Sequence, residues 1–191
     1  MPPWTAAWIA ATVLLIVIRV PHVRRSTKIK VKKSRIGPRE VLPIVGVGIG
    51  LLLPLVWLLT SFPACADRPR TPLPFAAGLL AYALGLWLLY RTHADLGTNW
   101  SNTLQVRENH TLVTNGSYRR VRHPMYTALF LYAIGQALVV PNLVAGPAFL
   151  MAFTLLIALR LGPEERLMRE EFGPAYDAYA AHTWRLVPGV W

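Results

Sequence analysis

Polar and ionisable residues with a defined spacing gather in the second half of the chain. His123 is followed at once by Pro124 and, three positions on, by Tyr126. Because proline suits the first turn of a helix, the sequence predicts a helix that begins at Pro124 with His123 just outside it. His123 and Tyr126 would then share one helix face. The positive end of the helix dipole beside them would favour an anionic group.

A second polar group surrounds the dipeptide Gly162-Pro163. If a helix continues through this point, Arg160 and Glu164 stand on one face, one turn apart. Pro163 would then remove a backbone donor and produce a kink. The alternative is that Glu164 and Glu165 form the charged start of a new helix. In either case, ionisable groups this close to a membrane are costly unless they are paired or functional.

The segment between Gln105 and Tyr118 has the composition of a loop. It is rich in Asn, Gly and Ser, so its backbone donors and acceptors are free to meet a ligand. No His or Cys set has the spacing of metal ligands, and we expect no metal. The single cysteine, Cys65, allows no internal disulfide.

The elements that must position these groups are predicted to cross a membrane. Only 15% of the residues are charged and 54% are hydrophobic, whereas soluble domains carry about 25% charged residues. Three uncharged stretches are long enough for one span each, and a fourth, 124–159, is long enough for two. Pro141-Asn142 divides the fourth into a helical hairpin. We therefore expect one all-α membrane domain, 1–191, with five spans near residues 4–20, 41–62, 73–90, 124–140 and 143–160.

The positive charges predict the orientation of these spans. Eight of the 20 Lys and Arg residues lie between Pro21 and Glu40, and the connections alternate between many and few positive charges. Cytoplasmic loops carry the excess, so the N-terminus is expected outside and the C-terminal segment, 161–191, in the cytoplasm. We interpret the basic loop 22–40 as a topology signal, and Arg119, Arg120 and Arg122 as anchors at the membrane surface. Charge clustered at span ends also argues against nucleic acid as a partner.

Two motif blocks resemble the isoprenylcysteine carboxyl methyltransferase family, which includes phospholipid methyltransferases and bacterial relatives. The first block is His110-Thr-Leu-Val-Thr-x-Gly-x-Tyr118-x-x-x-Arg122-His-Pro-x-Tyr126, and the second is Arg160…Glu164-Glu165…Phe172-Gly-x-x-Tyr-x-x-Tyr179. The resemblance covers about half of the chain, 96–188. The stretch Leu161-Gly-Pro163 departs from the more polar, acidic stretch of the eukaryotic enzymes, which bears on the substrate more than on the cofactor.

The resemblance implies an S-adenosylmethionine-dependent methyltransferase with a cytoplasm-facing cofactor pocket that the C-terminal segment completes. Arg160 and Glu164 are the candidate catalytic residues, Arg160 toward the substrate and Glu164 toward the ammonium of the cofactor. By position, the cofactor-binding residues would be Gln105, His110, Thr111, Leu112, Val113, Tyr118, His123, Pro124, Met125, Tyr126 and Glu164.

The methyl acceptor is left open by the sequence. The acceptor is lipophilic or membrane-delivered, and a prenylcysteine carboxylate, a phospholipid amine, a small thiol and an unknown lipid are all compatible with the motifs. The Ala-, Leu-, Arg- and Pro-rich composition favours a bacterial inner membrane over the endoplasmic reticulum. Two other functions are considered: a membrane reductase of the sterol-reductase type that uses NADPH, and a non-catalytic scaffold that binds membrane lipid.

Overall fold

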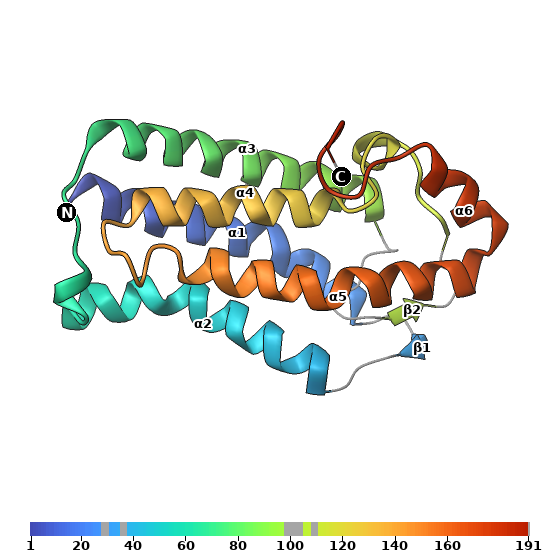
Figure 1. Ribbon diagram of the computed structural model, residues 1–191, viewed down its shortest axis with the longest axis horizontal. Helices are drawn as coiled ribbons and strands as arrows, with labels where there is room; N and C mark the ends of the chain where they lie inside the picture. The colour runs from blue at the N-terminus through green and yellow to red at the C-terminus, as the bar shows by residue number, and fades with distance from the viewer. Residues whose placement is uncertain (28–30, 35–37, 98–104, 108–110, 191) are drawn as a thin grey trace.

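The computed structural model describes residues 1–27, 31–34, 38–97, 105–107 and 111–190, and it is nearly all helical. Five long helices run side by side along the long axis of the molecule (Figure 1). They are α1 (Pro3–Ser26), α2 (Pro38–Thr60), α3 (Pro72–Leu96), α4 (Pro124–Val139) and α5 (Ala148–Phe172). The short helix α6 (Pro174–Ala181) lies at the opposite end of the molecule from the N-terminus (Figure 1).

Within the part of the chain that the structure describes, three helices are long and apolar enough to cross a membrane: α1, α3 and the Val41–Thr60 part of α2. Helix α4 is equally apolar but has only 16 residues, so it rises about 24 Å, less than the ~30 Å of a hydrocarbon core. The apolar part of α5 ends before Arg160. The chain is an integral membrane protein, and the count of five spans stays a prediction.

The predicted hairpin between the last two long helices is present, but its second helix differs from the expectation of 143–160. Helix α4 ends at Val139, and α5 begins only at Ala148 and continues through Pro163 to Phe172. Residues 143–147 belong to the turn because the buried Asn142 side chain accepts the backbone N–H groups of Val144 and Ala145. The helix passes Pro163 because that residue lies beyond the apolar part, where water can satisfy a freed carbonyl.

The close packing of α3 on α4 determines where the site helices lie. A Cβ added to Gly85 of α3 would lie 2.8 Å from the backbone oxygen of Ala128 and from the backbone nitrogen of Tyr132. Small residues allow such close approach between membrane helices. Helix α2 packs along α5, and α1 packs against α3 and α4. Aromatic rings fill the space between these helices, for example Tyr132 and Phe149, whose ring centroids are 5.7 Å apart.

One short antiparallel sheet departs from the all-α expectation. Strand β1 (Val31–Ser34) from the basic first connection pairs with β2 (Gln105–Arg107) from the third connection. The alternation of residue types is too short in either segment to predict a strand. Two short 3-10 helices are also present: η1 (Ala64–Ala66) lies in the second connection, and η3 (Gly116–Arg119) follows β2 in the third. The sheet lies at the same end of the molecule as α6 (Figure 1).

Candidate active site

The first turn of α4 presents two rings on one face, as predicted. Pro124 is the first helical residue, and His123 occupies the position before it with non-helical backbone angles. The His123 and Tyr126 rings stack with centroids 5.4 Å apart and planes inclined by 10°. Pro124 cannot donate a backbone hydrogen bond, which costs nothing at this position because the first helical N–H groups have no partner within the helix.

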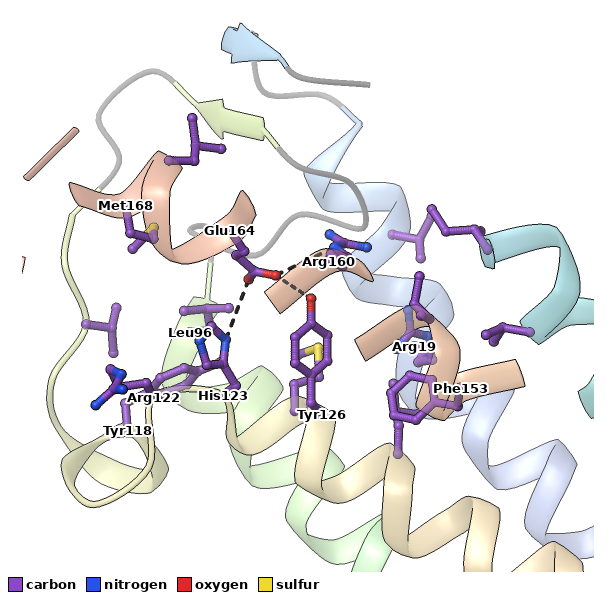
Figure 2. Close-up of a pocket in the computed structure, with 18 of the residues that line it drawn as sticks. Arg19, Leu96, Tyr118, Arg122, His123, Tyr126, Phe153, Arg160, Glu164 and Met168 are labelled. Atoms are coloured by element: carbon purple, nitrogen blue, oxygen red, sulfur yellow. Dashed lines mark hydrogen bonds and ion pairs between the residues drawn. The ribbon is translucent and has the colours of Figure 1, made fainter. Parts of the chain in front are cut away.

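The polar turn of α5 faces these rings. Arg160 Nε lies 3.5 Å from the Glu164 carboxylate, one helical turn away, so the predicted shared face is confirmed. The Tyr126 hydroxyl donates to the same carboxylate, and His123 Nδ1 lies 3.9 Å from it. Figure 2 shows His123, Tyr126 and Arg160 converging on Glu164. Since α5 is continuous here, the alternative of a new helix starting at Glu164 is wrong.

Glu165 points to a different set of partners and holds the tail in place. Its carboxylate lies 3.1 Å from Arg122 Nε, 3.3 Å from Arg185 and 3.6 Å from His123 Nε2. The His123 ring, with further contributions from Arg122 and Arg185, lowers the pKa of Glu165 to about 2 against the opposing effect of burial. Its side chain is 3% exposed, whereas that of Glu164 is 29% exposed. Glu165 is therefore enclosed by its ion-pair partners, whereas Glu164 keeps an exposed part that lines the cavity.

Arg122 is not the surface anchor that the sequence suggested. Besides its ion pair with Glu165, its guanidinium donates to the backbone oxygens of Ala180 and Thr183. The side chain is 9% exposed. A guanidinium with five donors can hold a carboxylate and two carbonyls at once, which explains why an arginine is buried here instead of extending to headgroups.

The tail after α6 pairs with the residues that precede α4. The backbone N–H of Arg122 donates to the Trp184 oxygen at 2.7 Å, and that of His123 donates to the Arg185 oxygen at 3.0 Å. The Thr127 hydroxyl donates to the Leu186 oxygen at 2.6 Å. The segment 184–186 thus holds the backbone from which His123 projects.

A cavity of about 430 Å³ contains the polar cluster. On α5 it follows one stripe of residues at intervals of three and four: Phe149, Phe153, Leu156, Arg160, Glu164, Leu167 and Met168. Such spacing keeps side chains on one helix face, and at 1.5 Å per residue the stripe is about 28 Å long. The cavity is therefore elongated, with an apolar part, a polar middle and an aromatic part near α6.

The two ends of the cavity have different walls. The apolar part is lined by Leu15, Ile16 and Val20 of α1 and by Ile44, Val47 and Leu51 of α2. The aromatic part is lined by Tyr118, Tyr176 and Tyr179. The loop that carries Tyr118 is held by two hydrogen bonds: Tyr179 donates to the Tyr118 oxygen at 2.7 Å, and the Ser117 N–H donates to the Asp95 carboxylate at 2.7 Å.

Most of the predicted site residues meet in this cavity. It is lined by Thr111, Leu112, Val113, Tyr118, His123, Met125, Tyr126, Arg160 and Glu164. Pro124 is buried in the first turn of α4 and is not among the lining residues. Gln105 belongs to β2, where only the backbone is described, and His110 lies outside the described residues.

Other lining residues were not predicted from the sequence. They are Arg19 with its apolar neighbours on α1 and α2, Leu96, Arg122, Leu129, Phe149, Phe153, Leu156, Leu167, Met168, Tyr176 and Tyr179. Arg19 directly follows an uncharged stretch, so the sequence indicates only that a span ends there. Tyr176 and Tyr179 belong to the second motif block, which is the signal that could have identified them as lining residues.

The arrangement is that of a cavity between helices, with a polar cluster in the middle, an apolar part on one side and an aromatic part on the other. Residues 76–170 match the model of the isoprenylcysteine carboxyl methyltransferase (ICMT) family. One relative is the protein-S-isoprenylcysteine O-methyltransferase of Dictyostelium discoideum, which is 30% identical over 96 residues, or 49% of this chain. Another is protein-S-isoprenylcysteine O-methyltransferase B of Arabidopsis thaliana, which is 30% identical over 115 residues, or 59% of this chain. This chain covers 40% and 58% of their lengths, about half of each relative.

A solved structure has the same fold. The eukaryotic intramembrane Ras methyltransferase ICMT superposes with a TM-score of 0.65 at 21% identity, covering 100% of this chain and 69% of that chain. The chain is a member of the isoprenylcysteine carboxyl methyltransferase family.

Proposed function

We propose that the protein transfers a methyl group from S-adenosylmethionine to a lipophilic acceptor that carries a carboxylate. The observation that carries the proposal is the position of Glu164, whose carboxylate lies at the polar middle of a cavity that continues as an apolar slot between α1, α2 and α5. One site can therefore hold a charged donor beside the head of an apolar acceptor. The curated relatives act on S-isoprenylcysteine by name.

The residues fit S-adenosylmethionine as the donor. Glu164 is the partly exposed carboxylate of the polar cluster and can accept hydrogen bonds from an ammonium group. Tyr126 and Arg160 hold that carboxylate in place. The aromatic part provides ring faces for a nucleoside. A cavity of about 430 Å³ is also within the range of small-molecule sites. The donor supplies an activated methyl group on a sulfonium.

The transfer needs alignment more than acid–base chemistry. An acceptor carboxylate is already ionised at neutral pH, so no general base is required. Arg160 can hold a carboxylate through two parallel hydrogen bonds, which directs one oxygen toward the methyl carbon. The apolar walls exclude water and thereby strengthen these contacts.

The charge of the cavity favours a carboxylate acceptor over an amine. Among the described lining residues, three carry a guanidinium, namely Arg19, Arg122 and Arg160, whereas Glu164 alone carries a carboxylate. Adding a protonated amine to this set would increase the repulsion, while an anionic head reduces it.

The proposal includes the orientation and the membrane. The basic connection after α1, with eight Lys and Arg residues between Pro21 and Glu40, supports a cytoplasmic pocket with the N-terminus outside. Composition supports a bacterial inner membrane. Labelling from the periplasmic and cytoplasmic sides would test the orientation, with native Cys65 as one site and, in a Cys65→Ser background, a single cysteine introduced at position 182 as the other.

Two measurements test the function. Isothermal titration in nanodiscs should show binding of S-adenosylmethionine, and NADPH in the same assay should show none; the reverse result would favour a reductase. A radiolabelled methyl-transfer assay on lipid extracts should then give a base-labile methyl ester, whereas a base-stable product would contradict the carboxylate acceptor.

A further inference from the structure

The α2 wall of the apolar part of the cavity has a gap at Gly48. From α2 the cavity is lined by Ile44, Val47, Gly48 and Leu51, and their spacing places them on one helix face. Three of these positions carry branched apolar side chains, and Gly48 carries none. A Cβ built at Gly48 meets no atom of the described residues within 4 Å. The missing side chain therefore leaves open space in this wall.

Packing between helices accounts for a neighbouring glycine, Gly50, and leaves Gly48 without a structural reason. At Gly50 a Cβ would lie 2.8 Å from the Ala148 backbone oxygen and 2.8 Å from the Phe149 Cα, so α2 and α5 touch there. A glycine inside a helix is less stable than an alanine unless close packing or the backbone requires it. Among the described residues, no such contact is present at Gly48.

Gly48 lies far from the polar cluster along the cavity. Helices α2 and α5 run in opposite directions (Figure 1), and Gly50 meets α5 at Phe149. Gly48 is about 3 Å along α2 from Gly50, and Arg160 is about 16 Å along α5 from Phe149. The levels of Gly48 and Arg160 therefore differ by about 13 Å. If the head of a ligand is held at Arg160, Gly48 lies beside the distal part of its apolar chain.

We infer that Gly48 sets the length of the apolar chain that the site accepts. The inference rests on the proposed function and adds a specificity-determining residue from a helix outside residues 76–170, which match the family. The distal part of the acceptor chain passes Gly48 on one side and the rings of Phe149 and Phe153 on the other. A larger side chain at position 48 would occupy the same space, so long chains would be rejected and short ones admitted. In an apolar pocket, one methylene group already changes selectivity by about tenfold or more.

Gly46 provides a matched control for Gly48. It belongs to the same helix, and a Cβ built there also meets no described atom within 4 Å. It is not among the lining residues of the cavity, because two positions along a helix correspond to a rotation of about 200°. Gly46→Leu and Gly48→Leu therefore make the same change in helix propensity and apolar surface, one outside the cavity and one inside it.

The test is isothermal titration in nanodiscs with three probes, namely N-acetyl-S-geranylcysteine, N-acetyl-S-farnesylcysteine and N-acetyl-S-geranylgeranylcysteine. Each variant is compared with the wild type for the same probe, so the partition of the probe into lipid cancels. For Gly48→Leu the loss of affinity should grow with chain length, from less than about threefold for geranyl to about tenfold or more for geranylgeranyl. Gly46→Leu should bind all three probes as the wild type does.

The smaller variant Gly48→Ala guards against a failure to fold. A thermal unfolding transition close to that of Gly46→Leu shows that Gly48→Leu is folded. If Gly48→Leu unfolds, Gly48→Ala decides the matter, because it should show the same dependence on chain length with a smaller loss.

The outcomes separate the inference from the proposed function. A loss that is equal for the three probes, or no loss, overturns the role of Gly48, and the methyltransferase proposal stands. A wild type that binds none of the three probes also overturns it. If the wild type binds the probes but neither S-adenosylmethionine nor S-adenosylhomocysteine, the proposed function fails, and the dependence on chain length still decides the role of Gly48.

Discussion

The Tyr126 hydroxyl donates a hydrogen bond to the carboxylate of Glu164, which lies 38 positions later in the chain. The bond joins the first turn of α4 to the polar turn of α5, across the cavity. Arg160 approaches the same carboxylate oxygen at 3.5 Å. The Glu164 side chain is therefore held by groups from two helices, so its position depends on how these helices pack.

Tyr126→Phe should weaken the binding of S-adenosylmethionine about threefold to tenfold. It removes one hydrogen bond to a charged group, which is worth about 1.5–3 kcal/mol. The affinity falls by less than this energy, because the bond orients Glu164 and does not itself contact the ligand. The ring and its stacking on His123 remain. Isothermal titration in nanodiscs measures the change. Tyr90→Phe is the control because Tyr90 is exposed on α3. Equal affinities for Tyr126→Phe and the control would remove Tyr126 from the site.

Glu164→Gln should reduce the affinity for S-adenosylmethionine about 10-fold to 100-fold, because an ammonium loses its charged partner. Binding of 5′-methylthioadenosine, which has the nucleoside but no ammonium, should be almost unchanged. Glu170→Gln removes a carboxylate from the exposed part of α5 and serves as the control. A similar loss for both ligands would show that Glu164 shapes the pocket and does not pair with the ammonium.

The sequence predicted the local geometry of the site well and its walls poorly. The relation of His123 to Tyr126 and that of Arg160 to Glu164 follow from helix periodicity, and both are present. Periodicity acts within one helix, so it could not show that Arg19 of α1 and Arg160 of α5 line the same cavity. Arg122 was misread for a related reason: a buried ion pair with Glu165 depends on the tail folding back, which no local pattern encodes.

Span boundaries were predicted less well where polar contacts decide them. The sequence pattern predicted that the last span starts at residue 143. In the structure the Asn142 side chain accepts the backbone N–H groups of Val144 and Ala145, and the helix begins only at Ala148. The pairing of β1 with β2 joins segments more than 70 positions apart, Val31 with Arg107. Its two strands are too short to give a signal by themselves.

Glu165 should make stability depend on acidity. Its folded pKa of about 2 is below its ordinary value of 4.5, so the stabilisation is complete above pH 4.5 and is lost as the pH falls from 4.5 toward 2. Glu165→Gln should be less stable at pH 7, because Arg122 is left buried without a carboxylate, and such a loss costs about 3–5 kcal/mol.

Thermal unfolding of both proteins in detergent between pH 7 and pH 3 tests this prediction. The difference in midpoint between the wild type and Glu165→Gln should shrink as the pH falls. A difference that stays constant over this range would contradict the pKa assignment. Glu170→Gln should follow the wild type, since exposed ion pairs contribute about 0–1 kcal/mol.

Gly85→Ala should destabilise the protein by about 1–3 kcal/mol, because the new methyl group meets backbone atoms of α4 at 2.8 Å and the two helices must separate. Gly46→Ala is the matched control, because a Cβ there has no atom within 4 Å and alanine favours a helix. Chemical unfolding monitored by tryptophan fluorescence would compare them. Equal stability of the two variants would mean that α3 and α4 are less tightly packed than described.

The pairing of residues 121–123 with 184–186 also bears on how the protein is made. Because the N-terminal part of a chain leaves the ribosome first, residues 121–123 emerge well before residues 184–186. During that interval the backbone donors of Arg122 and His123 lack the carbonyls that later receive them. The backbone from which His123 projects is therefore incomplete until residues 184–186 have left the ribosome. A chain truncated before residue 184 would lack these carbonyls.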